Sequence, residues 1–276
     1  MTTSVHTNAS ALVALQNLNA TNDRLADVQN RVNTGLRVQG AKDNASVWAI
    51  AQGQRADVGA LGAVKMSLDR ATSIADVALA AGTTVSDLLN QLKEKVVAAK
   101  DNSLNTQSRA ALNSDFRAIL KAITDTVNNA EFDGGNILNN GTDIRFIANA
   151  DADSFITLQA KNLSLGGSII TMAATASIST VTLATSVLTQ LEASIANTNA
   201  ALGQIGSQAK QIETHNKFVS LLTDTLEAGI GNLVDADLAR ESARLQALQV
   251  QQQLGAQALS IANQAPQIIL SLFRGG

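Results

Sequence analysis

Residues 184–229 read ATSVLTQLEASIANTNAALGQIGSQAKQIETHNKFVSLLTDTLEAG, and this stretch decides the fold of the chain. Apolar or small side chains recur in it, and a little beyond it, every seven residues in two interleaved series: Leu188, Ile195, Leu202, Ala209, and Leu191, Thr198, Ile205, Ile212, Val219, Leu226, Leu233. A seven-residue repeat of this kind is typical of a helix that packs lengthwise on another helix. At 1.5 Å per residue, this helix would be about 70 Å long, far longer than the average globular helix of ~11–12 residues.

Three helices are expected on the N-terminal side of this stretch. The first covers residues 10–33, where Leu18, Leu25 and Val32 recur every seven residues and Gly35 is placed to end the helix in the left-handed conformation. The second covers residues 44–100 without a proline. The third carries one apolar face with spacings of three and four: Leu112, Phe116, Ile119, Leu120, Ile123, Val127. The first helix is short and its apolar seam is narrow, so it needs a partner.

A last helical face is expected to continue along the C-terminal part of the chain until Pro266, because proline removes a helix hydrogen bond. Its apolar positions are Leu238, Leu245, Leu248 and Leu259. Beyond the proline, Ile268, Ile269, Leu270, Leu272 and Phe273 form an apolar tip that a soluble monomer has little reason to keep exposed.

The only strand pattern lies between these helical segments. Residues 144–147 and 155–158 are short apolar runs on either side of a polar turn, and they predict a small β-hairpin near residues 142–160. Residues 162–185 are rich in Ser and Thr and are expected to form a loop with a possible strand. The fold class is therefore mainly α, with long antiparallel helices and one small β-hairpin.

Composition excludes most chemical functions. The 276 residues include no Cys and only two His, so no thiolate site and no HExxH motif exist. His6 lies near the terminus, and His215 is expected on the solvated surface of the long helix. Acidic residues are scattered along helices rather than gathered round a pocket. We therefore expect no enzyme, no catalytic residue, no cofactor and no metal.

Charge and hydropathy narrow the possible partners and the location. The net charge of -3 gives no general attraction to nucleic acid or to an anionic membrane surface. No run approaches the ~20 apolar residues that cross a bilayer. The first eight residues also lack the basic and apolar regions of a cleaved secretory signal. We expect neither nucleic-acid binding nor membrane insertion, and any export would need a dedicated machine.

Two blocks at opposite ends of the chain resemble the bacterial flagellin family. The first is NTGLRVQGAKDNA at residues 33–45, whose motif positions are Gly35, Leu36, Arg37, Ala41, Lys42 and Asp43. The second is DADLARE at residues 235–241, followed by NQAPQ at residues 263–267; its motif positions are Asp235, Asp237, Glu241, Asn263, Gln264, Pro266 and Gln267. In the first block Asn44 stands where the family usually has a second Asp. The stretch EFDGGNIL at residues 131–138 is similar to the family's turn into its hairpin, so the resemblance covers nearly the whole chain.

The resemblance implies an architecture of two layers. Residues 1–40 and 235–276 would pair as an inner-layer terminal coiled coil, and residues 41–234 would form a layer of helical arms with the hairpin. Only residues 162–185 occupy the place of the variable outer domains of many flagellins, so this is expected to be a minimal form without a large outer domain. The inner-layer seam by which copies assemble would consist of Leu18, Leu25, Val32, Leu238, Leu245, Leu248, Leu259, Ile268, Ile269, Leu272 and Phe273.

The resemblance also implies a function. The chain would be an extracellular structural subunit that forms a helical homopolymer, the flagellar filament used for swimming. Its expected partners are the flagellar type III export apparatus, an export chaperone, the filament cap and the hook-junction proteins. One alternative is a hook–filament junction protein of the same axial family, and a second is a coiled-coil signalling rod such as a chemoreceptor cytoplasmic region. A soluble enzyme is a distant third.

Overall fold

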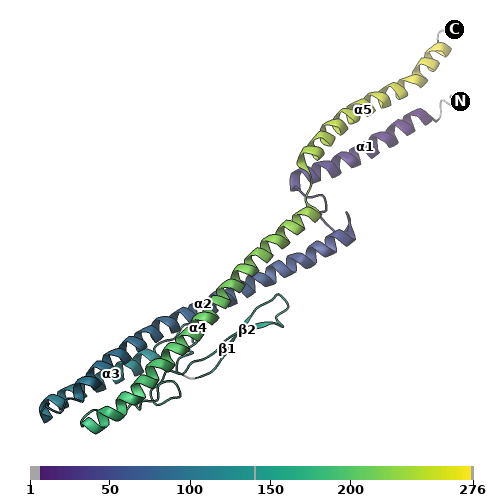
Figure 1. Cartoon of the computed structure of the whole chain (residues 1–276). Helices are drawn as coiled ribbons and strands as arrows, with labels where there is room; N and C mark the ends of the chain where they lie inside the picture. The colour runs from purple at the N-terminus through teal and green to yellow at the C-terminus, as the bar shows by residue number, and fades with distance from the viewer. Residues whose placement is uncertain (1–6, 140, 275–276) are drawn as a thin grey trace. The chain divides into compact units, whose positions relative to one another are not determined.

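The computed structural model describes residues 7–139 and 141–274, and it describes side chains as far as residue 264. Five helices and two strands lie in these residues: α1 Ala9–Thr34, α2 Ala45–Ala99, α3 Thr106–Asn128, β1 Ile144–Ile147, β2 Phe155–Leu158, α4 Val181–Val234 and α5 Leu238–Arg274 (Figure 1). The mainly α fold with one small hairpin is therefore confirmed.

The chain divides into two compact units. One contains residues 1–56 and 226–276, and the other contains residues 57–225. The first unit holds α1, α5 and the turns that follow α1 and precede α5. The second holds α3, the hairpin and the central parts of α2 and α4. The first unit also includes the adjoining ends of α2 and α4. The expected layers, residues 1–40 with 235–276 and residues 41–234, stay a prediction.

The core of the second unit is built from the seven-residue repeat. Leu191, Ile205, Ile212 and Val219 of α4 are almost completely buried, as expected for one seam of the long helix. The expected helix over residues 184–229 is longer than predicted and begins at Val181 and ends at Val234. From α2 the buried side chains include Leu61, Val64, Leu68, Ile74, Val85, Leu89, Leu92 and Val96.

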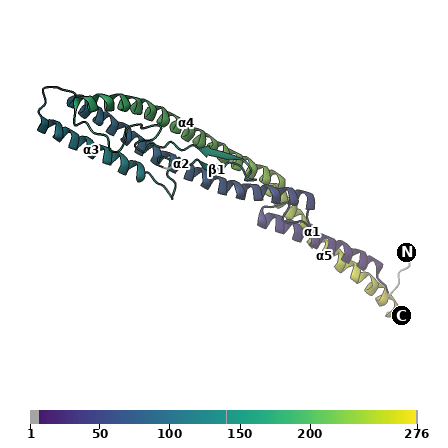
Figure 2. The same ribbon diagram turned by 90° about the horizontal axis from the view of Figure 1, so that it is seen from below.

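The third helix adds its apolar face to this core. Helix α3 runs beside α2 (Figure 2). Phe116, Leu120, Ile123 and Val127 of α3 are buried, which confirms the predicted spacing of three and four. Asn105 begins the helix by accepting the amide hydrogen of Ser108 on its side-chain oxygen at 2.7 Å.

The hairpin has the predicted strands. Ile144 pairs with Leu158 and Ile147 pairs with Phe155 in an antiparallel ladder. It packs on the long helices through a few specific bonds. The amide of Ile147 donates to Ser67 Oγ on α2 at 3.2 Å, and the amide of Gln159 donates to Gln208 Oε1 on α4 at 3.0 Å.

Residues 159–180 form a packed irregular segment and contain no strand. Leu163, Ile170, Met172 and Ile178 are completely buried, so this segment covers the core rather than extending into solvent. It is the only connection between the hairpin and α4, and its length leaves no room for a separate domain.

The prediction that the last helix ends at Pro266 is wrong, because α5 continues through this residue to Arg274. A proline inside a helix leaves one carbonyl without its donor and costs about 3 kcal/mol. The carbonyl concerned belongs to Ala262, and it accepts a hydrogen bond from the side chain of Asn8 on the neighbouring chain segment. This long-range contact could not be read from the local sequence.

Candidate functional site

The two sequence blocks from opposite ends of the chain meet in the first unit. Gly35 ends α1 with φ 72°, and its amide donates to the Arg31 carbonyl at 2.9 Å, which confirms the predicted left-handed cap. The carbonyl of Gly35 then accepts the amide hydrogen of Ala236 at 2.8 Å, and Leu36 pairs with Asp235 in an isolated antiparallel bridge. The turn after α1 is thereby hydrogen-bonded to the turn before α5.

Arg37 closes the C-terminal end of α4. The last carbonyls of a helix have no partner within the helix, and here the turn after α1 supplies the donors. The amide of Arg37 donates to the Val234 carbonyl at 2.7 Å, and Arg37 Nη2 donates to the Leu233 carbonyl at 2.9 Å. Val38 also donates to Val234 and is buried beside it.

The remainder of the first block is a side-chain-capped loop that leads into α2. Asp43 Oδ2 accepts the amide hydrogens of Gln39 at 2.8 Å and Gly40 at 3.1 Å. Asn44 Oδ1 accepts the amide hydrogen of Val47 at 3.1 Å at the start of α2. Asn is a good N-cap residue, so the departure from the family's usual Asp at this position leaves the cap in place. Ala41 and Lys42 are exposed.

The second block begins α5 and buries a carboxylate. Asp237 Oδ1 accepts the amide hydrogen of Arg240 at 3.1 Å and caps the helix. Glu241 lies in the first turn, where a negative charge is favoured by the helix dipole. Only 6% of Glu241 is exposed, and its Oε1 lies 3.0 Å from Arg244 and 3.8 Å from Arg31 on α1. A buried carboxylate needs such partners, and Arg31 is the one that links Glu241 of α5 to α1.

The helices α1 and α5 run antiparallel along each other (Figure 1). Thr21, Leu25 and Val28 are the buried residues of α1, and the other predicted seam residues of this pair are half-buried: Leu18, Val32, Leu245, Leu248 and Leu259. Leu238 is half exposed. The side chains of Pro266, Gln267, Ile268, Ile269, Leu272 and Phe273 lie outside the described residues, while Asn263 and Gln264 are exposed. The seam within one chain is therefore narrow.

A second apolar stripe lies on the opposite side of α5. Val250, Leu254 and Ile261 are 56%, 59% and 69% exposed. At about 100° per residue, these three positions fall within roughly 40° of one another and face away from the contact with α1. Leu12 and Val13 on α1 are exposed to a similar extent, 62% and 58%. The periodicity of the sequence predicted the seam that faces α1. It did not predict the stripe on the opposite side of α5.

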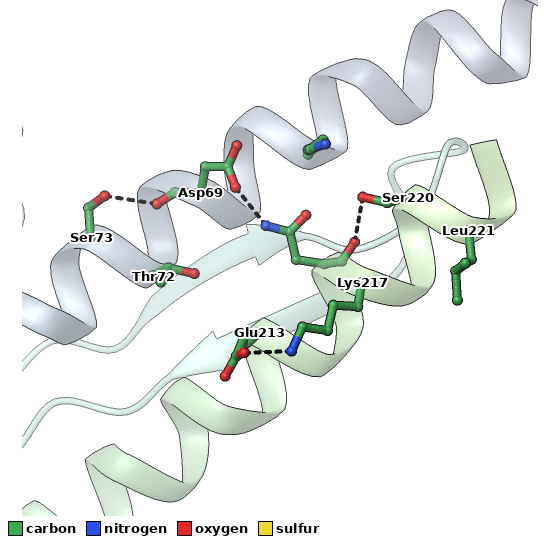
Figure 3. Close-up of a pocket in the computed structure, with 9 residues that line it drawn as sticks. Asp69, Thr72, Ser73, Glu213, Lys217, Ser220 and Leu221 are labelled. Carbon is green, nitrogen blue, oxygen red and sulfur yellow. Dashed lines mark hydrogen bonds and ion pairs between the residues drawn. The ribbon is translucent and has the colours of Figure 1, made fainter. Parts of the chain in front are cut away.

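An open groove lies between α2 and α4 in the second unit (Figure 3). Asn216 Nδ2 donates to Asp69 Oδ1 at 2.6 Å across it, and Lys217 pairs with Glu213 at 2.7 Å. Hydrogen bonds from Lys217 and Lys210 lower the pKa of Glu213 to about 2. The bond between Asn216 and Asp69 links α4 to α2, and the bonds of Glu213 join neighbouring turns of α4. Among these contacts of the groove, no nucleophilic side chain is paired with a general base.

His215 differs from its prediction as a solvated surface residue. It is half-buried, and its Nε2 donates to the carbonyl oxygen of Ala148 at 2.7 Å because the hairpin covers this part of α4. Among the described residues, no three His, Asp or Glu side chains gather closely enough to hold a metal ion. No helix in that part of the chain is long and apolar enough to cross a membrane.

Comparison with known families identifies the paired blocks. Residues 5–143 match the bacterial flagellin N-terminal helical region, and residues 188–273 match the bacterial flagellin C-terminal helical region. The two matched regions together span most of the sequence and include both blocks. The protein is therefore a helical structural protein of the bacterial flagellum. The chain belongs to the bacterial flagellin family.

Individual relatives agree with this assignment. The chain is 53% identical over 280 residues to flagellin FljJ of Caulobacter vibrioides, with 100% of both chains covered. It is 39% identical to a flagellin of Brucella melitensis, with 99% of both chains covered. Among solved structures, Bacillus cereus flagellin shares the fold with a TM-score of 0.50 at 18% identity, covering 55% of this chain and 88% of that one. A putative flagellar hook-associated protein from Vibrio parahaemolyticus has a TM-score of 0.55 at 11% identity, covering 70% of this chain and 100% of that one.

Family membership establishes the general role of the protein. It is a structural subunit of the extracellular flagellar filament and serves motility; it is not an enzyme. Members of the family form a polymer. The chain of 276 residues is a short, minimal flagellin, and its alignment with flagellin FljJ covers all of both chains. The hook–filament junction alternative is not favoured, because the full-length relatives of high identity are flagellins.

Proposed function

We propose that the antiparallel pair α1–α5 is the inner-layer surface through which copies of this chain associate in the filament. The single observation that carries the proposal is the exposed apolar stripe of Val250, Leu254 and Ile261, which faces away from α1. Exposed apolar residues gathered on one face are typical of an association surface. The occupant of this surface is the terminal helix pair of neighbouring copies.

In this arrangement each terminal helix has two apolar faces. The inner face, which contains Leu25 and Val28, packs within the chain. The outer face packs between chains, where Leu12 and Val13 of α1 would contribute with the stripe on α5. The seam positions Leu18, Val32, Leu245, Leu248 and Leu259, which are half-buried in one chain, would become fully buried on assembly. Leu238 would be covered in the same way.

We further infer the layer organisation and partners from the family resemblance. Residues 1–40 with 235–276 form the inner layer, and residues 41–234 form the surrounding helical layer. The chain is exported by the flagellar type III apparatus with an export chaperone, and it is inserted between the hook-junction proteins and the filament cap. The match to both flagellin regions supports this set of partners.

The proposed surface is tested by the polymerisation of a variant in which polar residues replace part of the apolar stripe. The double variant Leu254→Gln, Ile261→Gln replaces two apolar side chains that are each worth about 1.5–3 kcal/mol when buried. The monomer concentration left in equilibrium with seeded filaments should rise by about a hundredfold or more. The unfolding transition of the monomer should remain unchanged, because both positions are exposed in the single chain.

The matched control is Gln253→Ala, an exposed position about 100° around α5 from Leu254. This control should polymerise like the parent protein. Filaments of the double variant that form at the parental concentration would contradict the proposed association surface.

A further inference from the structure

Pro266 creates an unusual requirement within the terminal helix pair. It lies inside α5, which continues to Arg274, and its nitrogen carries no hydrogen. The carbonyl oxygen of Ala262, four residues earlier, therefore lacks the donor that every other residue type at position 266 would provide. Buried or half-buried carbonyls without donors are unfavourable, so an external donor is needed.

Asn8 provides this donor. Its Nδ2 donates to the Ala262 carbonyl oxygen at 2.7 Å, across 254 residues of sequence. At the same time its Oδ1 accepts the amide hydrogen of Ala11 at 3.1 Å and caps the start of α1. One side chain thus satisfies an unpaired amide at the beginning of α1 and an unpaired carbonyl near the end of α5.

Only a carboxamide of this length can make both bonds. The side chain of Asp or Ser can cap a helix, but ionised Asp has no hydrogen to donate, and a single hydroxyl must reach both partners from one atom. Asp at position 8 would also direct a negative charge at a carbonyl oxygen. The chemistry of the site therefore selects Asn.

Three further contacts between α1 and α5 have the same antiparallel register. Asn22 Oδ1 accepts from Gln252 Nε2 at 2.8 Å, and Arg31 pairs with Glu241 at 3.8 Å. A Cβ added to Gly255 would lie 3.2 Å from Leu18 Cδ1, so the helices approach closely there. Because the apolar seam repeats, it permits slippage, and specific polar contacts are the means by which helix pairs fix one register.

We propose that Asn8 and Pro266 form a register lock: the missing amide of Pro266 makes the Ala262 carbonyl available, and Asn8 is the positioning residue that captures it. The lock couples the start of α1 to the last turns of α5, so the two ends of the chain become ordered together. It does so whichever face of the pair meets neighbouring copies, and it is therefore independent of the proposed association surface.

A double-mutant cycle on the full-length protein tests the lock. Asn8→Asp keeps the N-cap of α1, removes the donor to the Ala262 carbonyl oxygen and leaves a carboxylate oxygen in its place. Pro266→Ala restores a backbone donor inside α5 and makes the contribution of Asn8 to Ala262 unnecessary. The four proteins (parent, two single variants and the double variant) are assembled on seeds, and both the residual monomer concentration and the hydrogen exchange of residues 258–274 in the filament are measured.

In the parent background, Asn8→Asp should raise the residual monomer concentration by roughly tenfold and accelerate exchange in this segment, as expected for a lost hydrogen bond in a half-buried position. In the Pro266→Ala background, the same substitution should change both quantities by less than about twofold, since the carbonyl is then satisfied within α5. Equal effects of Asn8→Asp in the two backgrounds, or no effect in the parent, would overturn the proposal. Unchanged thermal unfolding of the 57–225 unit confirms that the variants fold.

Discussion

Arg37 Nη2 donates a hydrogen bond of 2.9 Å to the carbonyl oxygen of Leu233, so that a residue near the N-terminus closes a helix almost two hundred positions later in the chain. The backbone amide of Arg37 makes a second bond to the neighbouring carbonyl of Val234 at 2.7 Å. The Gly-Leu-Arg motif and the DADLARE motif are thus two halves of one structure. Each supplies hydrogen-bonding groups that the other lacks.

Removal of the Arg37 side chain should loosen this junction. Arg37→Ala loses a charge-assisted bond to an exposed helix end, for which we expect a cost of about 0.5–1.5 kcal/mol in the stability of the terminal unit within the filament. Hydrogen exchange of the amides in residues 231–241 should report it. Lys42→Ala, at an exposed position in the same loop, is the control and should leave exchange unchanged. Equal protection in the two variants would show that the Arg37 side chain is dispensable.

Two glycines of α2 should respond to alanine with opposite signs. A Cβ on Gly82 would lie 2.3 Å from Leu202 Cδ2, so Gly82→Ala forces a repacking that costs about 1–3 kcal/mol. Alanine gains up to ~1 kcal/mol of helix propensity, which leaves a net destabilisation of Gly82→Ala. At Gly59 nothing lies within 4 Å of the added atom, so Gly59→Ala should stabilise by up to ~1 kcal/mol.

Urea unfolding of the two glycine variants gives the measurement. Leu202→Ala should cost less stability in the Gly82→Ala background than in the parent, since it removes the atom that the new Cβ meets. The expectation fails if Gly82→Ala is as stabilising as Gly59→Ala.

Protonation of Glu213 should lower the folding stability of the protein between about pH 4.5 and pH 2. Lys217 and Lys210 lower the pKa of Glu213 from 4.5 to about 2. A lowered pKa means that the stabilising contribution is complete above pH 4.5 and is lost as the pH falls toward about 2. Because the group is exposed, the effect should be small and should shrink in high salt.

The pH prediction is checked by urea unfolding of the parent protein and of Glu213→Gln at pH 6 and pH 3 in low salt. The stability difference between the two proteins should be larger at pH 6. A difference between parent and Glu213→Gln that does not change with pH would contradict the assignment.

The terminal helices should be ordered mainly in the polymer. Within one chain α1 buries only Thr21, Leu25 and Val28, which is too little apolar area to offset the conformational entropy of two long helices. We expect rapid hydrogen exchange in residues 9–34 and 238–264 of the monomer and slow exchange of the same residues in the filament. Residues 61–96, which carry a continuous buried face, should be protected in both states. Equal protection of the terminal helices in the two states would refute this expectation.

The sequence by itself determined the elements with strong local signals. The seven-residue repeat of α4, the apolar face of α3, the two strands and the left-handed cap at Gly35 all depend on residues close in sequence, and the structure has each of them. The family blocks at both ends likewise identified the class of protein before any contact was known. Local periodicity also indicated which positions are candidates for the seam, although it could not separate the face that packs within one chain from the outer stripe.

Only the tertiary structure decided the features that depend on a distant partner. Helix α5 passes through Pro266, where the local rule predicted an end, and Asn8 satisfies the carbonyl that the proline leaves open. His215 is half-buried because the hairpin lies over it, and residues 159–180 are packed because their apolar side chains reach the core. In each case the local preference is worth only a few kcal/mol, and contacts supplied from far along the chain, which the local sequence does not contain, act against it.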